Sequence, residues 1–345
     1  MIETRIAIDA MGGEYGVSVT VPAALSLLRD HKMVFFYLVG DEPQIRAQLE
    51  MVGYTGNKIE IIHTPYLLTD KDKPTRALRA KEKSSLYMAV ELVKDKLAGA
   101  CVSAGNTGAL LLAGRHLLGT LPGIDKPAIV AVIPGASKNC LLLDVGANVD
   151  CKAQQLFQFA VMGSVLAESM GVMQPASVGL LNIGVEDYKG NEQVRTAASL
   201  LEQCSSINYT GYVEGNALFS GTVDVVVCDG FVGNVTIKSS AGVVEVVNSL
   251  LRSRMQGSLA SKLLSLVSFP LIRRLQSRIN PAQYNGASLL GLQGSIIKSH
   301  SNAGSEAFAY AIQRAITEAE SAIPRLIAQR VAEIVGVSMQ QEAAV

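Results

Sequence analysis

The 345-residue sequence has little charge and few cysteines, and both shortages limit what the protein can be. Charged residues make up 17% of the chain, and 30 basic residues balance 30 acidic ones. Because a dedicated nucleic-acid-binding protein normally carries a basic field, this neutrality argues against nucleic acid as a partner. The five cysteines include no Cys-x-x-Cys pair. Their spacing excludes a disulfide scaffold and a cysteine-rich zinc site, and predicts a reducing compartment.

Long hydrophobic runs and the common catalytic signatures are also missing. No uncharged apolar run approaches the ~20 residues that a membrane span requires, and the N-terminal residues show no apolar signal core. We therefore predict a cytoplasmic globular protein. The sequence also lacks the dinucleotide-binding glycine pattern, the Walker motif, and the zinc-protease and serine-hydrolase signatures. The four histidines are scattered, so we expect no metal site.

Short β-branched runs alternate with amphipathic stretches along the chain. The predicted strands are 5–8, 34–39, 59–63, 100–103, 128–133, 141–144, 177–182 and 223–228. The predicted helices are 17–28, 43–52, 84–96, 107–118, 153–170 and 191–203. This alternation predicts an α/β fold of three layers, α/β/α, with a mostly parallel sheet. No composition break precedes about residue 330, so we predict one domain over 1–335 and a tail over 336–345.

Five of the predicted strands end in turns of small or polar residues that lead toward a helix. The turns contain Gly12, Gly105, Gly146, Gly184 and Gly230. Ligands of open α/β sheets bind at the carboxyl ends of strands, where helix N-termini present free N–H groups. Together the five turns predict one shared polar cleft, although each turn alone is also explained by tight chain connections.

The sharpest local signal is the turn Ser103-Ala-Gly105-Asn106-Thr107. Unpaired N–H groups at the following helix, two hydroxyls and the Asn106 amide make a site for an anion such as phosphate. The helix that follows has no acidic residue before Asp125. Basic residues that would neutralise the anion, or simply form a solvated helix face, cluster just upstream: Arg76, Arg79, Lys81 and Lys83.

A second turn repeats this arrangement. Asp229 ends a strand, and Gly230 and Gly233 allow the backbone to approach a ligand. Lys238 lies about one turn into the next helix, where it would stabilise developing negative charge or be an ordinary surface lysine.

The third feature is a stretch without acidic residues. No Asp or Glu occurs between residues 246 and 305. Basic residues stand among apolar ones in this stretch, at Arg252, Arg254, Lys262, Arg273, Arg274 and Arg278. We predict a basic amphipathic helical arm at about 246–281 that contacts a membrane surface or an acidic protein partner. The alternative is a dimerisation arm with a basic exposed face.

Six motifs, in order over about residues 4–325, closely resemble the PlsX family, the bacterial phosphate acyltransferases of phospholipid synthesis. The motifs lie at 8–13, 102–110, 143–150, 180–184, 227–234, and 289–292 with 297–300. Three positions differ from the family pattern. Glu14 replaces Asp and keeps its charge, Val185 replaces an acid, and Ser301 stands where Gly is usual. Val185 therefore puts in doubt a carboxylate role at that position.

The resemblance implies conversion of acyl-[acyl carrier protein] and inorganic phosphate to acyl phosphate and free carrier protein. A membrane glycerol-3-phosphate acyltransferase would then consume the acyl phosphate. The family's fold is similar to those of phosphotransacetylases and of isocitrate and isopropylmalate dehydrogenases. Its members are homodimers at the inner face of the cell membrane, peripherally bound, without a cofactor.

The motif positions also imply site residues. Phosphate binding falls to Asp9, Gly12, Gly13, Ser103, Gly105, Asn106, Thr107, Asp229, Gly230 and Gly233. Asn106, Asn234 and Lys238 would polarise the thioester carbonyl. Lys298 and His300 would complete the anion site or act as acid toward the leaving thiol. Since phosphate itself attacks the thioester, no nucleophilic side chain is required.

Three alternatives stay open at this point. The first is a phosphotransacetylase-like enzyme that acts on acyl-CoA. The second is a decarboxylating dehydrogenase of similar fold, and the third is a non-catalytic membrane or carrier-protein adaptor.

Overall fold

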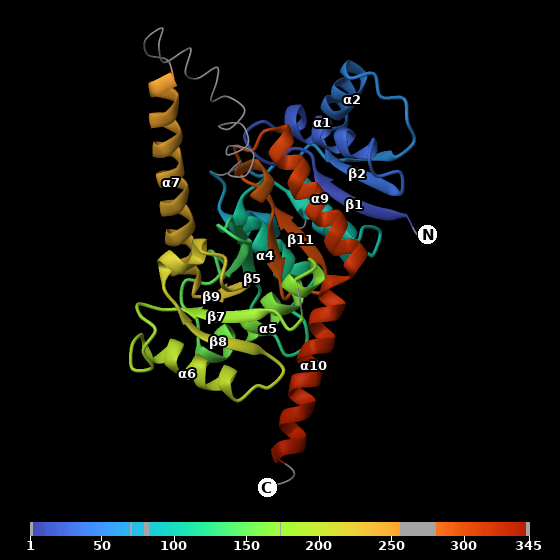
Figure 1. Ribbon diagram of the computed structural model, residues 1–345. Helices are drawn as coiled ribbons and strands as arrows, with labels where there is room; N and C mark the ends of the chain where they lie inside the picture. Colours follow the sequence, from blue (N-terminus) through green and yellow to red (C-terminus); the bar gives the residue numbers. More distant parts are fainter. Residues whose placement is uncertain (1–2, 70, 79–82, 173, 256–280, 343–345) are drawn as a thin grey trace.

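The sheet at the centre of the molecule contains eleven strands (Figure 1). The computed structural model describes residues 3–69, 71–78, 83–172, 174–255 and 281–342. The strands are β1 (Thr4–Asp9), β2 (Val34–Gly40), β3 (Ile59–His63), β4 (Ala100–Ser103), β5 (Ala128–Ile133), β6 (Cys140–Leu143), β7 (Ser177–Leu181), β8 (Asn208–Val213), β9 (Val225–Val227), β10 (Ala287–Leu290) and β11 (Ser295–Lys298).

Helices cover both faces of the sheet. They are α1 (Val17–Leu28), α2 (Glu42–Met51), α3 (Ser85–Lys94), α4 (Thr107–Leu117), α5 (Ala153–Ser169), α6 (Glu192–Glu202), α7 (Gly230–Met255), α9 (Ser305–Ser321) and α10 (Ile323–Glu342). Short 3₁₀ turns lie at η1 (Pro74–Leu78), η2 (Gly215–Phe219) and η3 (Pro281–Tyr284). Among the described residues, no helix combines the length and apolar character needed to cross a membrane.

The two-residue period of the strands explains why helices lie on both sides. In β1, Ala7 packs with α3 and α4, whereas Ile6 and Ile8 pack with α1 and α9. The other half of the sheet follows the same rule. Leu143 packs with α5 and α10, and Leu142 packs on the opposite face with the side of α7. The three-layer α/β/α prediction is therefore confirmed.

Four of the predicted helices begin at a residue whose side chain accepts a hydrogen bond from the backbone N–H three positions on. These capping residues are Asp41 of α2, Ser84 of α3, Asn106 of α4 and Asn191 of α6. Such caps satisfy N–H groups that a helix start leaves without partners. They explain why these predicted helix starts agree with the structure to within two residues.

Every predicted strand and helix is present, with small shifts at its ends. The sequence analysis missed β8, β10, β11, α9 and α10, and it gave no bounds for α7. Strands β10 and β11 are four residues each, and β8 is interrupted by Gly211 at φ 95°. These features weaken the alternating pattern that marks a strand. Helix α10 continues to Glu342, past the predicted boundary at 335, and the domain bounds stay a prediction.

The strand order is β3-β2-β1-β4-β11-β10-β5-β6-β9-β7-β8. Strands β1–β4 and β11 are mutually parallel, and β10 is antiparallel to both β11 and β5. Strand β6 is antiparallel to β5, and β6, β9, β7 and β8 are mutually parallel. The strand-end turns therefore belong to two oppositely directed sets. The mostly parallel sheet is confirmed, and the shared cleft expected from the five turns stays a prediction.

The core prediction concerns Phe159, which is fully buried on α5. We expect Phe159→Ala to lower the free energy of unfolding by about 3–5 kcal/mol, because it removes apolar contacts and leaves a cavity. Phe231→Ala is the matched control, since Phe231 is 62% exposed, and its effect should stay within about 0.5 kcal/mol. Urea denaturation measures both, and equal losses would contradict the core assignment.

Candidate active site

Three neighbouring parallel strands, β1, β4 and β11, end in polar residues at one rim of the sheet. We call this the first rim, formed by turns 9–14, 103–107 and 298–301. Asp9 and Ser103 are both buried there, and the Ser103 hydroxyl donates a hydrogen bond to Asp9 Oδ2 at 2.6 Å. The backbone N–H of Gly105 donates to Ser103 Oγ at 3.0 Å. The Ser103 hydroxyl is thus already engaged in holding the turn.

Burial raises the pKa of the Asp9 carboxyl, although the hydrogen bond from Ser103 opposes this shift. The side chain is therefore a buried hydrogen-bond partner of Ser103 and not a solvent-exposed carboxylate at the rim.

Glycines at the first rim let its turns approach closely. A Cβ atom on Gly12 would lie 2.5 Å from Asp9 Oδ2 and 2.8 Å from the Gly105 nitrogen. Gly13 has φ 85°, and a Cβ atom there would lie 2.8 Å from the Ser301 carbonyl oxygen. The predicted Gly12, Gly13 and Gly105 positions are consequently brought together, and their geometry has no room for a side chain.

Helix α4 begins at the first rim. Asn106 Oδ1 accepts the Ala109 N–H at 2.9 Å, so this oxygen caps the helix. The Asn106 amide nitrogen is then the part of this side chain that donates to a ligand. Thr107 is exposed beside it, in the first turn of a helix of 11 residues. The positive end of the α4 dipole and its first N–H groups therefore lie at this rim.

Lys298 and His300 lie at the same rim. The Lys298 ammonium donates to the Ala104 carbonyl oxygen at 3.4 Å and also to the Ser299 carbonyl oxygen. The backbone N–H of His300 donates a hydrogen bond to Asn285 Oδ1 at 3.0 Å. Although His300 reaches the surface, enclosure of its ring by protein lowers its pKa, and the Lys298 charge lowers the pKa further.

The second rim consists of turns 144–148, 182–190 and 229–234, which follow β6, β7 and β9. Asp229 Oδ1 accepts the Val232 N–H at 2.8 Å and so caps α7. A Cβ atom on Gly230 would lie 2.5 Å from the Asn148 carbonyl oxygen, and one on Gly233 would lie 1.9 Å from the Asp144 carbonyl oxygen. The start of α7 is therefore packed directly on the 144–148 turn.

Asp144 organises that turn from inside. Its buried carboxylate accepts the backbone N–H groups of Ile129, Gly146, Ala147 and Asn148 at 2.7–3.1 Å. Burial raises the pKa of Asp144, and the N–H donors oppose the shift. Both rims thus contain a buried aspartate at a strand end that holds the turn.

Asn234 and Lys238 project from α7 at the second rim. The Asn234 side chain lies next to Gly146, and Lys238 is exposed one turn further on. Among the described residues, no hydrogen bond or ion pair connects Asn234 or Lys238 with the first rim. The predicted site residues therefore form two groups.

The sequence analysis missed a further basic residue at the second rim. The Lys189 ammonium pairs with Glu186 Oε2 at 2.8 Å, and its backbone carbonyl accepts a hydrogen bond from Asn182 Nδ2 at 3.1 Å. The signal in the sequence was the pair of glycines at 184 and 190, which indicates a tightly folded turn. In the structure, a Cβ atom at Gly184 would collide with the Lys189 side chain. The acid at 186, rather than Val185, supplies the carboxylate of this turn.

Four of the five cysteines are poor nucleophiles. Burial raises the pKa of Cys140 and of Cys151 to about 12, and it also raises the pKa of Cys101 and of Cys228. A thiol reacts as its thiolate, so these four side chains are inert at neutral pH. In the part of the chain that the structure describes, no group of three His, Cys, Asp or Glu side chains is placed to hold a metal ion.

Other predicted basic residues have different surroundings. Arg76 pairs with Asp72 at 2.6 Å, and Lys83 pairs with Glu91 at 2.8 Å, both on the surface. Arg252 and Arg254 belong to α7, whose backbone is described there. The remaining predicted positions lie outside the described residues: Arg79, Lys81, Lys262, Arg273, Arg274 and Arg278.

The Lys298 charge next to His300 leads to a test. Because a neighbouring cation disfavours the protonated imidazole, Lys298→Met should raise the pKa of His300 toward its ordinary value of 6.5. Lys238→Met, at the second rim, should leave it unchanged. An NMR titration of the His300 ring measures both, and an unaltered His300 pKa in Lys298→Met would contradict the geometry of this rim.

Comparison with known proteins identifies the family. The family model described as "Fatty acid synthesis protein" matches residues 4–325. The phosphate acyltransferase of Stutzerimonas stutzeri is 48% identical over 329 residues, covering 95% of this chain and 92% of the relative. That of Shewanella sediminis is 48% identical over 336 residues, covering 97% and 98%.

Solved structures support the fold. A phosphotransacetylase from Streptococcus pyogenes superposes with a TM-score of 0.64 at 16% identity, covering 92% of this chain and 94% of that one. A branched-chain phosphotransacylase from Enterococcus faecalis gives 0.55 at 15% identity, covering 92% and 99%. Identity this low supports a shared fold only. The near-half identity to the curated relatives, in contrast, sets aside the dehydrogenase and adaptor alternatives, and the chain belongs to the fatty acid synthesis protein family, the PlsX family of phosphate acyltransferases.

Proposed function

We propose that the protein transfers the acyl group of acyl-[acyl carrier protein] to inorganic phosphate, releasing free carrier protein and acyl phosphate. The observation that carries this proposal is the turn between β4 and α4. There, helix α4, which has 11 residues and no acidic residue in its first turn, begins beside Asn106 and Lys298. The glycines of the first rim pack closely around this helix start. This combination suits a phosphate ion, which binds helix N-termini and cationic side chains.

Phosphate binding at the first rim assigns different roles to the predicted residues. The first N–H groups of α4, the Asn106 amide and the Thr107 hydroxyl are the donors. Asp9 and Ser103 do not contact the phosphate in this proposal. They hydrogen-bond each other and hold the turn that binds it. Lys298 supplies the positive charge, and its contact with the Ala104 carbonyl oxygen keeps it close to the turn.

The reaction then needs no covalent intermediate on the protein. A phosphate oxygen attacks the thioester carbon, a C–O bond forms, and the C–S bond breaks as the thiolate leaves. Water supplies the proton that the thiolate takes up, because the lowered pKa of His300 disfavours the protonated imidazole that would act as the acid. The raised pKa values of Cys101, Cys140, Cys151 and Cys228 favour this direct attack over acyl transfer through one of these thiols.

Asn234 and Lys238 are proposed to polarise the thioester carbonyl from the second rim. Adjacent strands in a sheet rotate by about 20–25°. Five steps separate β4 from β9, so the two oppositely directed sets are turned far from a flat antiparallel arrangement. Figure 1 agrees, since β7 and β8 lie steeply across the direction of β11. This rotation favours two rims that face a common cleft.

The acid-free stretch supports the proposed partners. Helix α7 leads into it and exposes apolar side chains over its outer half, at Val243, Val246, Val247 and Leu250. A helix face in water normally carries polar side chains, and apolar ones normally pack against another surface. We assign this region to contact with an anionic membrane surface and the acidic carrier protein, in a cytoplasmic homodimer bound peripherally at the inner face of the cell membrane. A membrane glycerol-3-phosphate acyltransferase would consume the product for phospholipid synthesis.

The test is release of free thiol from palmitoyl-[acyl carrier protein] by the purified protein, with and without phosphate. We expect phosphate-dependent release together with a hydroxylamine-reactive acyl phosphate. Release without phosphate would indicate a thioesterase and contradict the proposal. Faster turnover of palmitoyl-CoA than of the carrier-bound donor would favour the phosphotransacetylase-like alternative.

Asn106 allows the phosphate role to be separated from the structural one. Aspartate caps a helix as well as asparagine does, so Asn106→Asp should keep the unfolding free energy. It should nevertheless raise KM for phosphate about tenfold or more, because a negative charge replaces the amide donor. Asn106→Ala should lose about 1 kcal/mol of stability with the cap.

The control makes the reverse exchange at a distant cap. Asp41 caps α2 through the Gln44 N–H at 3.0 Å, so Asp41→Asn should change neither stability nor KM. Steady-state kinetics and thermal denaturation provide the two readouts. An unchanged KM in Asn106→Asp would place the phosphate elsewhere.

A further inference from the structure

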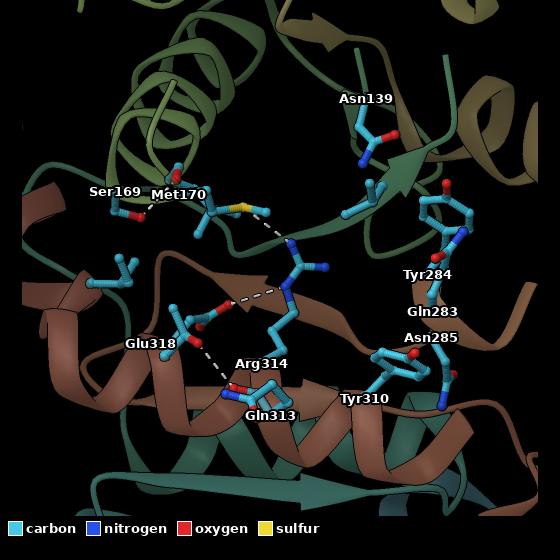
Figure 2. Close-up of a pocket in the computed structure, with 14 residues that line it drawn as sticks. Asn139, Ser169, Met170, Gln283, Tyr284, Asn285, Tyr310, Gln313, Arg314 and Glu318 are labelled. Atoms are coloured by element: carbon cyan, nitrogen blue, oxygen red, sulfur yellow. Dashed lines mark hydrogen bonds and ion pairs between the residues drawn. The ribbon is translucent and has the colours of Figure 1, made fainter. Parts of the chain in front are cut away.

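A cavity of ≈ 350 Å³ opens on the α9 face of the sheet, away from α3 and α4 (Figure 2). It lies between α9, the end of α5, the β5–β6 connection and η3. Its walls include none of the residues assigned to acyl transfer. Asn285 separates it from the first rim, where this buried side chain binds the His300 N–H and the Ser299 hydroxyl.

Arg314 and Glu318 are the charged residues that line this cavity, and the Arg314 guanidinium has few hydrogen-bond acceptors. Its side chain is 11% exposed. The guanidinium donates to the Gly286 carbonyl oxygen at 3.0 Å and to Met170 Sδ at 3.4 Å, and its Nε lies 3.9 Å from Glu318 Oε1. A thioether is a weak acceptor, and 3.9 Å is too long for a hydrogen bond. One strong acceptor therefore serves a group with five N–H donors.

The nearest carboxylate does not make up the deficit. Glu318 is buried and accepts a hydrogen bond from the Ser288 hydroxyl, which engages the same Oε1 atom that faces Arg314. A buried cation that lacks acceptors is costly, because it has lost water without replacing the hydrogen bonds. An anion in the cavity would supply them.

The other residues that line the cavity indicate the chemistry of the rest of the ligand. Figure 2 shows Arg314 reaching from α9 toward the middle of the cavity, with Met170 on one side and Tyr284 and Tyr310 on the other. Asn139 carries an amide at the opposite wall. Aromatic and thioether surfaces pack against a flat apolar body, whereas amides bind its polar edge. The volume is at the small end of ligand pockets, which fits a metabolite-sized molecule.

We infer that this cavity is a binding site for a small organic anion, a carboxylate or a phosphate monoester, separate from the acyl-transfer site. The anionic group binds the Arg314 guanidinium. The body of the ligand packs between Met170 and the two tyrosines, and Asn139 lies at the mouth.

The test uses benzoate and phenyl phosphate as probes, with benzyl alcohol as the uncharged analogue. Binding to the full-length protein is measured by isothermal calorimetry and ligand-observed NMR without any acyl donor, so the result does not depend on the proposed reaction. We expect one equivalent of at least one anion to bind and benzyl alcohol to bind at least tenfold more weakly. The preferred probe distinguishes a carboxylate ligand from a phosphate ligand.

Three variants in the cavity and one control at the first rim locate the binding. Arg314→Gln should weaken the anion about tenfold or more, since it removes a charge-assisted hydrogen bond. Asn139→Asp should weaken it severalfold by charge repulsion, whereas the neutral Asn139→Ala should not. Asn139 is exposed, so these two variants decide the question even if Arg314→Gln fails to fold. Asn106→Asp, at the first rim, should bind the probe as the unaltered protein does.

Several results would overturn the inference. These are no binding of either anion, equal binding of benzyl alcohol, and equal binding by Asn139→Asp and Asn139→Ala. Loss of binding in Asn106→Asp alone would also overturn it, because the probe would then occupy the phosphate site. Phosphate-dependent thiol release would be unaffected by any of these results, so the two proposals fail separately.

Discussion

The parallel pairing of β11 with β4 is the interaction on which the rest of the structure depends. Its register places Lys298 beside Ser103, which brings a basic residue from late in the chain to the turn that starts α4. The antiparallel partner β10 then joins this half of the sheet to β5 and reverses the strand direction. Without β10 and β11, the sheet would fall into two halves with open edges, and the turn between β4 and α4 would lose its contact with Lys298.

The two rims solve the same physical problem in the same way. A strand-end turn leaves several backbone N–H groups without partners. A buried aspartate accepts hydrogen bonds from these groups, or it accepts one from the side chain that binds them. Asp144 performs this task directly, and Asp9 does so through Ser103. Burial raises the pKa of both carboxyls, and the hydrogen bonds that they accept oppose this shift.

Much of the fold could be predicted from the sequence because β-branched runs and capping residues are local signals. Strands β10 and β11 could not, since four-residue strands carry little pattern and their central place depends on distant partners. The site was harder to predict. Ser103, Asp229 and Asn106 were selected as ligand-binding residues, yet a side-chain oxygen of each accepts a backbone N–H of its own turn. Small polar residues serve caps and ligands alike, so the sequence pattern alone does not separate the two roles.

The distance in sequence between β4 and β11 also matters while the protein is being made. Lys298 lies 194 residues after Ala104, the residue whose carbonyl oxygen it contacts. At a synthesis rate of about 5–20 residues per second, roughly 10–40 s pass between translation of the two segments. During that interval β4 has no partner on one side, and unpaired strand edges favour association between chains. A chain that ends before β11 therefore leaves this edge of β4 unpaired.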